Sequence, residues 1–223
     1  MKSRVSIIIP TYNEAGGIEA LLMHLKSSFP ETEIIVADGG SSDDTAALAR
    51  PYARVIDAGR GRAVQMNAGA REASGEVLWF LHADCWPSAS SVDLIGEALA
   101  DDGVIAGGFR WELSGSRWYY KPSTALAHLK NRRKRNLFGD MGIFIRKDVF
   151  DRVGGYKEIP LLEEVELNER LREMGGIALL DEPLPSSDRK LMKEGPMLTF
   201  IKNDILKIAY LFGFSPEFLK RFY

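Results

Sequence analysis

Residues 5–14, VSIIIPTYNE, begin with a short apolar run rich in β-branched side chains and end in a polar loop. A run that is apolar at successive positions is typical of a strand buried on both faces, as in a parallel sheet. The segment PTYNE is the expected exit loop of that strand. The stretch therefore predicts a buried parallel strand as the first regular element.

The segments that follow alternate between helical and extended patterns. Apolar residues at helical spacing predict a helix from Ile18 to about Leu25, closed by SFPE at 28–31. Further helices are predicted at 45–50, within 59–75 and around 91–100, and further strands at 33–37, 54–57, 76–81 and 104–113. This alternation predicts an α/β fold with a mostly parallel sheet and helices on both sides.

The pattern is less regular beyond residue 113. Residues 140–156 predict a strand, a short helix and a glycine turn, and residues 162–174 predict a helix with an apolar stripe of Leu167, Leu171 and Met174. Leu198, Ile201, Ile205, Ile208 and Phe212 form a later helical stripe, which we expect to dock onto the protein's own core. Shallow insertion into a membrane surface is the alternative.

Composition excludes some classes of partner. With 29 Lys and Arg against 31 Asp and Glu, the formal charge is -2, which offers no global field for nucleic acid. The single Cys85 fits a reducing compartment, VSIIIP is too short for an export signal, and IAYLFGF (208–214) falls short of the roughly 20 residues of a membrane span. We expect a cytoplasmic protein, with peripheral contact at the inner membrane face as an alternative.

Three polar loops follow predicted strands: PTYNE, DGGSSDDT (38–45) and HADCWP (82–87). Ligands of open α/β sheets bind beyond the carboxyl ends of the strands, so these loops should converge. Tyr12 could stack on a base, and Glu14, Asp38 and Asp84 could accept hydrogen bonds or hold a hard divalent cation. Asp43 or Asp44 is expected to cap the following helix.

These motifs carry a resemblance. In order and spacing, residues 4–176 resemble the family-2 glycosyltransferases of the GT-A fold, through IIIPTYNE, VADGGSSDDT, GRGRAVQMNAGAREASGEVLWFLHAD, GDMGIFIRKDVFDRVGGY and LLEEVELNERLREMGG. The compact size and the ending YLFGFSPEFLKRFY also resemble a small bacterial subgroup associated with radical-SAM or selenium-related genes.

The resemblance implies an activity and a layout. It implies a metal-dependent transferase that moves a sugar from a nucleotide diphosphate sugar, expected to be a UDP-sugar, to an unknown acceptor with inversion, using Mn²⁺ or Mg²⁺. It also implies a single domain, 1–223, with a nucleotide-binding half (1–113), an acceptor and catalytic half (114–190) and C-terminal helices (191–223). The rivals are a sugar nucleotidyltransferase, which needs a glycine-rich basic loop after the first strand, and a non-catalytic nucleotide-sugar binding protein. A dehydrogenase is disfavoured because no G-x-G-x-x-G follows that strand.

The resemblance also implies a donor site. Tyr12 would stack on the base and Asp38 would accept a hydrogen bond from it, while Arg60 and Arg62 would approach the diphosphate. The alternatives are a Tyr12 ring packed on the sheet edge, Asp38 as a turn former, and solvated arginines. The remaining residues implied at this site are Pro10, Thr11, Glu14, Asn67 and Ala83.

The family's metal motif has two acids flanking one residue, whereas this chain has His82 and Asp84 at those positions. The resemblance implies that Asp84 ligates the metal directly. For His82, a ligand and a structural residue remain the alternatives.

The resemblance places the catalytic base in the acidic pair Glu163 and Glu164. The helical wheel does not decide between them, and both could be first-turn acids favoured by the helix dipole. Because the second acid acts as base in the family, Glu164 is the expected base. The basic run NRRKR (131–135) is either a solvated helix face or an electropositive rim for a phosphorylated or lipid-linked acceptor.

Overall fold

The computed structural model of the protein describes residues 4–114, 136–187, 202, 205–206, 208–210 and 212–222. Its described strands form a seven-stranded sheet in the order β3-β2-β1-β4-β6-β5-β7. Neighbours pair in parallel except β6, which is antiparallel to both β4 and β5. The strands are β1 (Val5–Thr11), β2 (Glu33–Asp38), β3 (Arg54–Asp57), β4 (Val77–Phe80), β5 (Val104–Leu113), β6 (Phe144–Arg146) and β7 (Gly176–Ser186).

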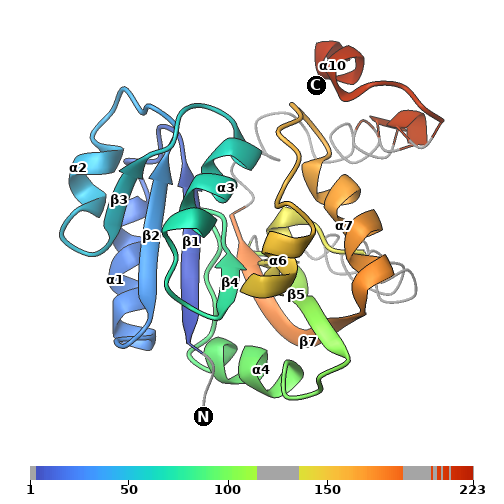
Figure 1. Ribbon diagram of the computed structural model, residues 1–223. Helices are drawn as coiled ribbons and strands as arrows, with labels where there is room; N and C mark the ends of the chain where they lie inside the picture. The colour runs from blue at the N-terminus through green and yellow to red at the C-terminus, as the bar shows by residue number, and fades with distance from the viewer. Residues whose placement is uncertain are drawn as a thin grey trace.

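Helices cover both faces of this sheet (Figure 1). On one face, Ile7 and Ile9 of β1 join a core cluster with α1 (Ile18–Ser28), α2 (Thr45–Ala49) and α4 (Ser91–Ala98). On the other face, Ile8 joins a cluster with α3 (Arg62–Glu72), α6 (Lys147–Arg152) and α7 (Glu163–Met174). In Figure 1, α3 and α6 lie in front of the strands. The predicted α/β fold with a mostly parallel sheet is confirmed.

Helix α3 lies unusually close to the sheet. A Cβ at Gly69 would collide with the side chain of Ile8 in β1, so only glycine permits this approach. In the first turn of α3, Gln65 reaches the carbonyls of Thr11 and Ala37, so the helix begins near the carboxyl ends of β1 and β2. This close packing brings the start of α3 to the edge at which the loops converge.

The sequence pattern missed β7. Its sequence, GIALLDEPLPS, holds two prolines and two acids, which are rare in a central strand. The strand pairs with β5 at the edge of the sheet, its register shifts between Gly108 and Arg110, and its last residue, Ser186, forms an isolated antiparallel bridge with Cys85. An edge strand tolerates proline because one side of its backbone needs no sheet partner.

Two predicted apolar stripes are corrected by the structure. Leu167 and Leu171 of α7 are buried, but Met174 is 43% exposed at the end of the helix. In the C-terminal stripe, Ile205, Ile208 and Phe212 are exposed, so the prediction that they dock on the core is wrong. Leu206 is buried instead. The prediction failed because hydropathy identifies an apolar helix face without showing which surface, if any, covers it. Leu198, Ile201 and the basic run 131–135 lie outside the described residues.

The described chain ends with two short elements, α10 (Pro216–Leu219) and the 3₁₀ turn η2 (Lys220–Phe222). A further 3₁₀ turn, η1 (Gly139–Met141), precedes β6. Within the described ranges, every helix is too short or too polar to cross a bilayer.

Candidate active site

The loops that follow β1 and β2 are joined by hydrogen bonds. Asn13, which adopts a left-handed backbone conformation (φ 56°), donates its N–H to Ser41 Oγ at 2.9 Å, and its side-chain oxygen accepts from the Ser42 N–H at 2.8 Å. The Glu14 N–H donates to Thr45 Oγ1 at 2.8 Å, and the Glu14 carbonyl accepts from the first turn of α1. The predicted convergence of these two loops is confirmed.

Asp38 lies at the carboxyl end of β2, as predicted, and is 7% exposed. Its carboxylate accepts from Thr11 Oγ1 at 3.0 Å, from Ser41 Oγ at 2.5 Å, and from the N–H groups of Gly40 and Ser41 at 3.1 and 2.8 Å. Since a carboxylate offers about four acceptor positions, these bonds occupy them. The structure thus gives Asp38 the turn-forming role, and its contact with a base stays a prediction.

Tyr12 is 39% exposed at the tip of the first loop. The Arg60 guanidinium lies 4.5 Å from the centre of its ring, a cation–π contact. One face of the Tyr12 ring therefore packs against Arg60. The sequence analysis predicts that Tyr12 contacts the base of the donor and Arg60 its diphosphate. Pro10 and Thr11 of β1 pair with Ala37 and Asp38 of β2.

Helix α3 supports both loops through a residue that the sequence analysis missed. Gln65 is buried, and its Nε2 donates to the carbonyl oxygens of Thr11 and Ala37 at 2.7 and 2.9 Å. These carbonyls belong to residues at the carboxyl ends of β1 and β2. Gln65 could have been noticed as a polar residue on the buried face of a predicted helix, but a hydropathy pattern gives such a residue no weight.

The loop after β4 carries the predicted metal ligands. The ligand atoms of His82, Asp84 and Cys85 lie within 4.8 Å of one another. Burial and the nearby Asp84 and Asp140 carboxylates raise the pKa of the Cys85 thiol, so the thiol stays protonated and is a poor ligand for a hard cation. Ala83, whose place at the donor site stays a prediction, buries its side chain in the apolar core.

The predicted acidic pair begins α7, directly after Leu162, whose backbone is left-handed (φ 67°). Glu163 and Glu164 are buried, and Arg62 Nη1 of α3 lies 3.6 Å from Glu163 Oε1 and 3.1 Å from Glu164 Oε1. Arg62 therefore contacts this pair, a partner different from the predicted diphosphate.

The two carboxylates share a desolvated environment. Burial and the Glu164 charge raise the pKa of Glu163 to about 7, although Arg62 and His82 act in the opposite direction. Two neighbouring buried carboxylates resist ionising together, so the pair retains a proton near neutral pH. A pair in this state can accept a second proton on its ionised member, as a general base must.

The turn η1 joins the predicted metal loop to the acidic pair. His82 Nδ1 lies 3.1 Å from Asp140 Oδ1, and a Cβ at Gly139 would collide with His82 Nε2 and meet Glu164 Oε1 at 2.8 Å. His82 Nε2 and Glu164 Oε1 thus both lie where a side chain at Gly139 would be. The sequence analysis missed Gly139 and Asp140 because they lie outside the HAD and EE motifs.

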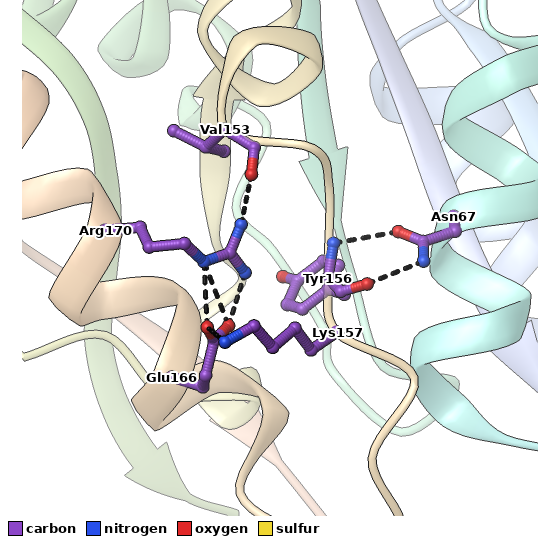
Figure 2. Close-up of polar contacts among 6 residues, drawn as sticks. All are labelled: Asn67, Val153, Tyr156, Lys157, Glu166 and Arg170. Atoms are coloured by element: carbon purple, nitrogen blue, oxygen red, sulfur yellow. Dashed lines mark hydrogen bonds and ion pairs between the residues drawn. The ribbon is translucent and has the colours of Figure 1, made fainter.

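Asn67, whose place at the donor site stays a prediction, binds the backbone of the loop that precedes α7 (Figure 2). Its Nδ2 donates to the Tyr156 carbonyl at 2.8 Å, and its Oδ1 accepts from the Tyr156 N–H at 2.9 Å. Lys157 of the same loop forms an ion pair of 2.6 Å with buried Glu166 of α7, and Arg170 Nε, one turn further along α7, donates to Glu166 Oε1 at 3.0 Å. These contacts fix the start of α7, and with it the acidic pair, relative to α3.

Comparison with known proteins identifies the family. The family described as Glycosyl transferase family 2 matches residues 6–156, and the chain belongs to this family. Glycosyltransferase AglE of Haloferax volcanii is 30% identical over 168 residues, which is 68% of this chain and 55% of AglE. The chain spans about half the length of the curated relatives it matches.

Solved structures support the GT-A fold predicted from the sequence. The mannosyltransferase PcManGT from Pyrobaculum calidifontis, in complex with GDP-Man and Mn²⁺, superposes with a TM-score of 0.67 at 20% identity, covering 83% of this chain and 57% of PcManGT. Glucosyl-3-phosphoglycerate synthase from Mycobacterium tuberculosis, in complex with Mn²⁺, UDP and glucosyl-3-phosphoglycerate, gives 0.62 at 20% identity, covering 86% and 75%. At this identity the likeness concerns the fold.

Proposed function

We propose that this family-2 glycosyltransferase uses a nucleotide diphosphate sugar, with UDP as the expected nucleotide, and transfers the sugar to an acceptor hydroxyl with inversion. The observation that carries the proposal is the Arg62–Glu164 contact of 3.1 Å, which joins a buried carboxylate of α7 to the first residue of α3. Both solved relatives named above hold a nucleotide and Mn²⁺, one with GDP-Man and the other with UDP.

In the proposed reaction Glu164 is the general base. Its carboxylate takes the proton of the acceptor hydroxyl as the oxygen attacks the anomeric carbon, and the bond from that carbon to the diphosphate breaks. Arg62 forms an ion pair with Glu164, while the raised pKa of Glu163 lets that residue carry the proton that the pair retains. The Gly139 turn and the Asn67 contacts with Tyr156 hold the base in place.

The residues of the HAD loop fit a divalent cation. Asp84 offers an oxygen and His82 a nitrogen, a combination that suits Mn²⁺ better than Mg²⁺, which prefers oxygen ligands. A bound cation would supply Lewis-acid stabilisation of the leaving diphosphate. Tyr12 and Arg60 lie at the neighbouring loop end, where a base and a phosphate would be bound.

A thermal-shift panel of UDP, GDP, CDP and ADP, each with and without Mn²⁺, tests the donor. We expect UDP and Mn²⁺ together to stabilise the protein more than either alone, by about 2.7 kcal/mol at 100 times the dissociation constant. A shift with GDP alone would change the nucleotide and keep the class. No shift with any nucleotide would refute the proposal, and nucleotide binding without slow hydrolysis of any nucleotide sugar would favour a non-catalytic binding protein.

A further inference from the structure

Asn168 is a buried amide on the same face of α7 as Glu164. The two residues are four positions apart in the helix, so their side chains are neighbours, and both are buried. The Asn168 amide binds one backbone with both of its polar atoms. Its Nδ2 donates to the Leu137 carbonyl at 2.6 Å, and its Oδ1 accepts from the Leu137 N–H at 3.1 Å. One side chain of α7 therefore fixes the chain at Leu137.

Leu137 leads into η1, the turn that lies against the candidate base. A Cβ at Gly139, two residues later, would come within 2.8 Å of Glu164 Oε1 and 2.4 Å of His82 Nε2. The Glu164 carboxylate is thus packed against the backbone of this turn. Because a close-packed interior transmits small displacements, a shift of η1 would either press on the carboxylate or leave a gap beside it.

The other end of η1 is fixed by the sheet. Trp79 Nε1 of β4 donates to the Gly142 carbonyl at 3.1 Å, and the Trp79 side chain is completely buried. A Cβ at Gly142 would meet Leu184 of β7 at 2.7 Å and Trp79 Nε1 at 3.0 Å. The turn is therefore held at its end by the sheet and at its start by α7, through Asn168.

We propose that Asn168 is a positioning residue for the base: by holding Leu137, it keeps η1 packed against the Glu164 carboxylate. The inference rests on the proposed function, in which Glu164 takes the proton of the acceptor hydroxyl. Asn168 acts through the turn and exchanges no proton. Since an error of about 1 Å in the placement of a reacting group can slow a reaction by up to about 10²-fold, loss of this support should slow the proton transfer.

Asn168→Ala tests the proposal, because it removes both bonds to Leu137 and adds no charge beside the acidic pair. Hydrolysis of UDP-glucose, UDP-N-acetylglucosamine and GDP-mannose is measured at saturating Mn²⁺, well below the unfolding midpoint of the variant. For a donor that the wild type turns over, we expect kcat to fall at least about tenfold. The donor KM should change less than about threefold, because Gln65 still ties the loops after β1 and β2 to α3.

Hydrogen exchange follows the turn itself and needs no ligand. Within η1, the Met141 N–H donates to the Phe138 carbonyl at 2.9 Å. The Gly142 N–H donates to the Gly139 carbonyl at 3.1 Å. In Asn168→Ala these two amides should exchange at least about tenfold faster than in wild type, beyond any change in the amides of β1, because the turn opens locally. Unchanged exchange at both amides would overturn the proposal, since the turn would then hold without Asn168.

Leu25→Ala is the matched control for lost stability. Leu25 is fully buried in α1, in the core on the face of the sheet opposite α7. Its truncation should lower the unfolding midpoint at least as much as Asn168→Ala does, with kcat within about twofold of wild type and no selective change at η1.

Two kinetic outcomes would overturn the proposal. A kcat of Asn168→Ala within about twofold of wild type would show an idle amide, and an equal loss of kcat in Leu25→Ala would show a merely structural one. A wild type that hydrolyses none of the donors would refute the proposed function itself. An active wild type with an equally active Asn168→Ala would refute this inference alone.

Discussion

Arg62 and Glu164 form an ion pair of 3.1 Å although they lie 102 residues apart in the chain. Arg62 begins α3, which packs on β1 through Gly69, and Glu164 begins α7. Their contact joins the predicted nucleotide-binding half to the predicted acceptor and catalytic half at the candidate active site. The predictions below test what this junction does.

Glu164→Gln should lower sugar transfer by roughly 10²–10⁴, the usual effect of losing a general base, with donor binding changed only a few-fold. The amide preserves shape and cannot take a proton. Steady-state kinetics and nucleotide titration measure the two effects. Full activity in Glu164→Gln together with loss in Glu163→Gln would reverse the two roles.

The raised pKa of Glu163 predicts a pH-dependent stability. The folded protein holds this proton up to about pH 7, whereas the unfolded chain releases it near the ordinary value of 4.5. The stabilisation is therefore complete below about pH 4.5 and is lost as the pH rises to 7. Glu163→Gln should remove this loss. Between pH 5 and pH 8, the free energy of unfolding of the variant should therefore rise relative to that of wild type by on the order of 2 kcal/mol. Urea denaturation at both pH values measures the difference, and parallel pH curves would refute it.

Asp84→Asn should weaken Mn²⁺-dependent nucleotide binding sharply and leave metal-independent binding through the Tyr12 loop. The change removes the charge that a hard cation needs and keeps the side-chain shape. Calorimetric titration of UDP with and without Mn²⁺ separates the two. Normal binding in Asp84→Asn, with loss in His82→Ala, would transfer the principal ligand role to His82.

Gly139→Ala should impair turnover with little effect on stability. The added Cβ would meet the far ends of the His82 and Glu164 side chains, which can shift without unfolding the protein, but shifting them disturbs the site. We expect a change below about 1 kcal/mol in the free energy of unfolding and a clear loss of donor turnover.

Gly96→Ala is its control, because a Cβ there meets nothing within 4 Å and lies inside α4. It should stabilise by up to about 1 kcal/mol with activity unchanged. Equal turnover in both alanine variants would show that the Gly139 packing has no role in the site.

Asn67→Asp should destabilise the protein by about 1–3 kcal/mol, since the carboxylate can accept from the Tyr156 N–H but leaves the Tyr156 carbonyl without its donor. Asn67→Asp should also lower turnover, because the loop that leads to α7 loses a fixed point. Chemical denaturation and kinetics on the same preparation measure both. A variant as stable and active as wild type would leave Asn67 without the assigned positioning role.

The sequence by itself determined the α/β class and most element positions, but not all of the residues that face the core. β3 and β5 lie at the predicted residues, because apolar periodicity records burial directly. It also identified the acidic pair and the three loops, since motif spacing survives in the chain whatever the packing. The sequence analysis missed the edge strand β7 because the prolines at 183 and 185 are atypical of an extended segment in a sheet.

Only the tertiary structure decided which side chains meet. In the described residues, Asp38 accepts hydrogen bonds from its own loop, Arg62 contacts Glu164, and Asn67 binds the Tyr156 backbone. Some of these contacts depend on how α3 and α7 pack on the sheet, and others depend on the geometry of a loop. Hydropathy encodes neither. A hydrogen bond depends on positions within a few tenths of an ångström, and such positions follow from the packed core rather than from local sequence.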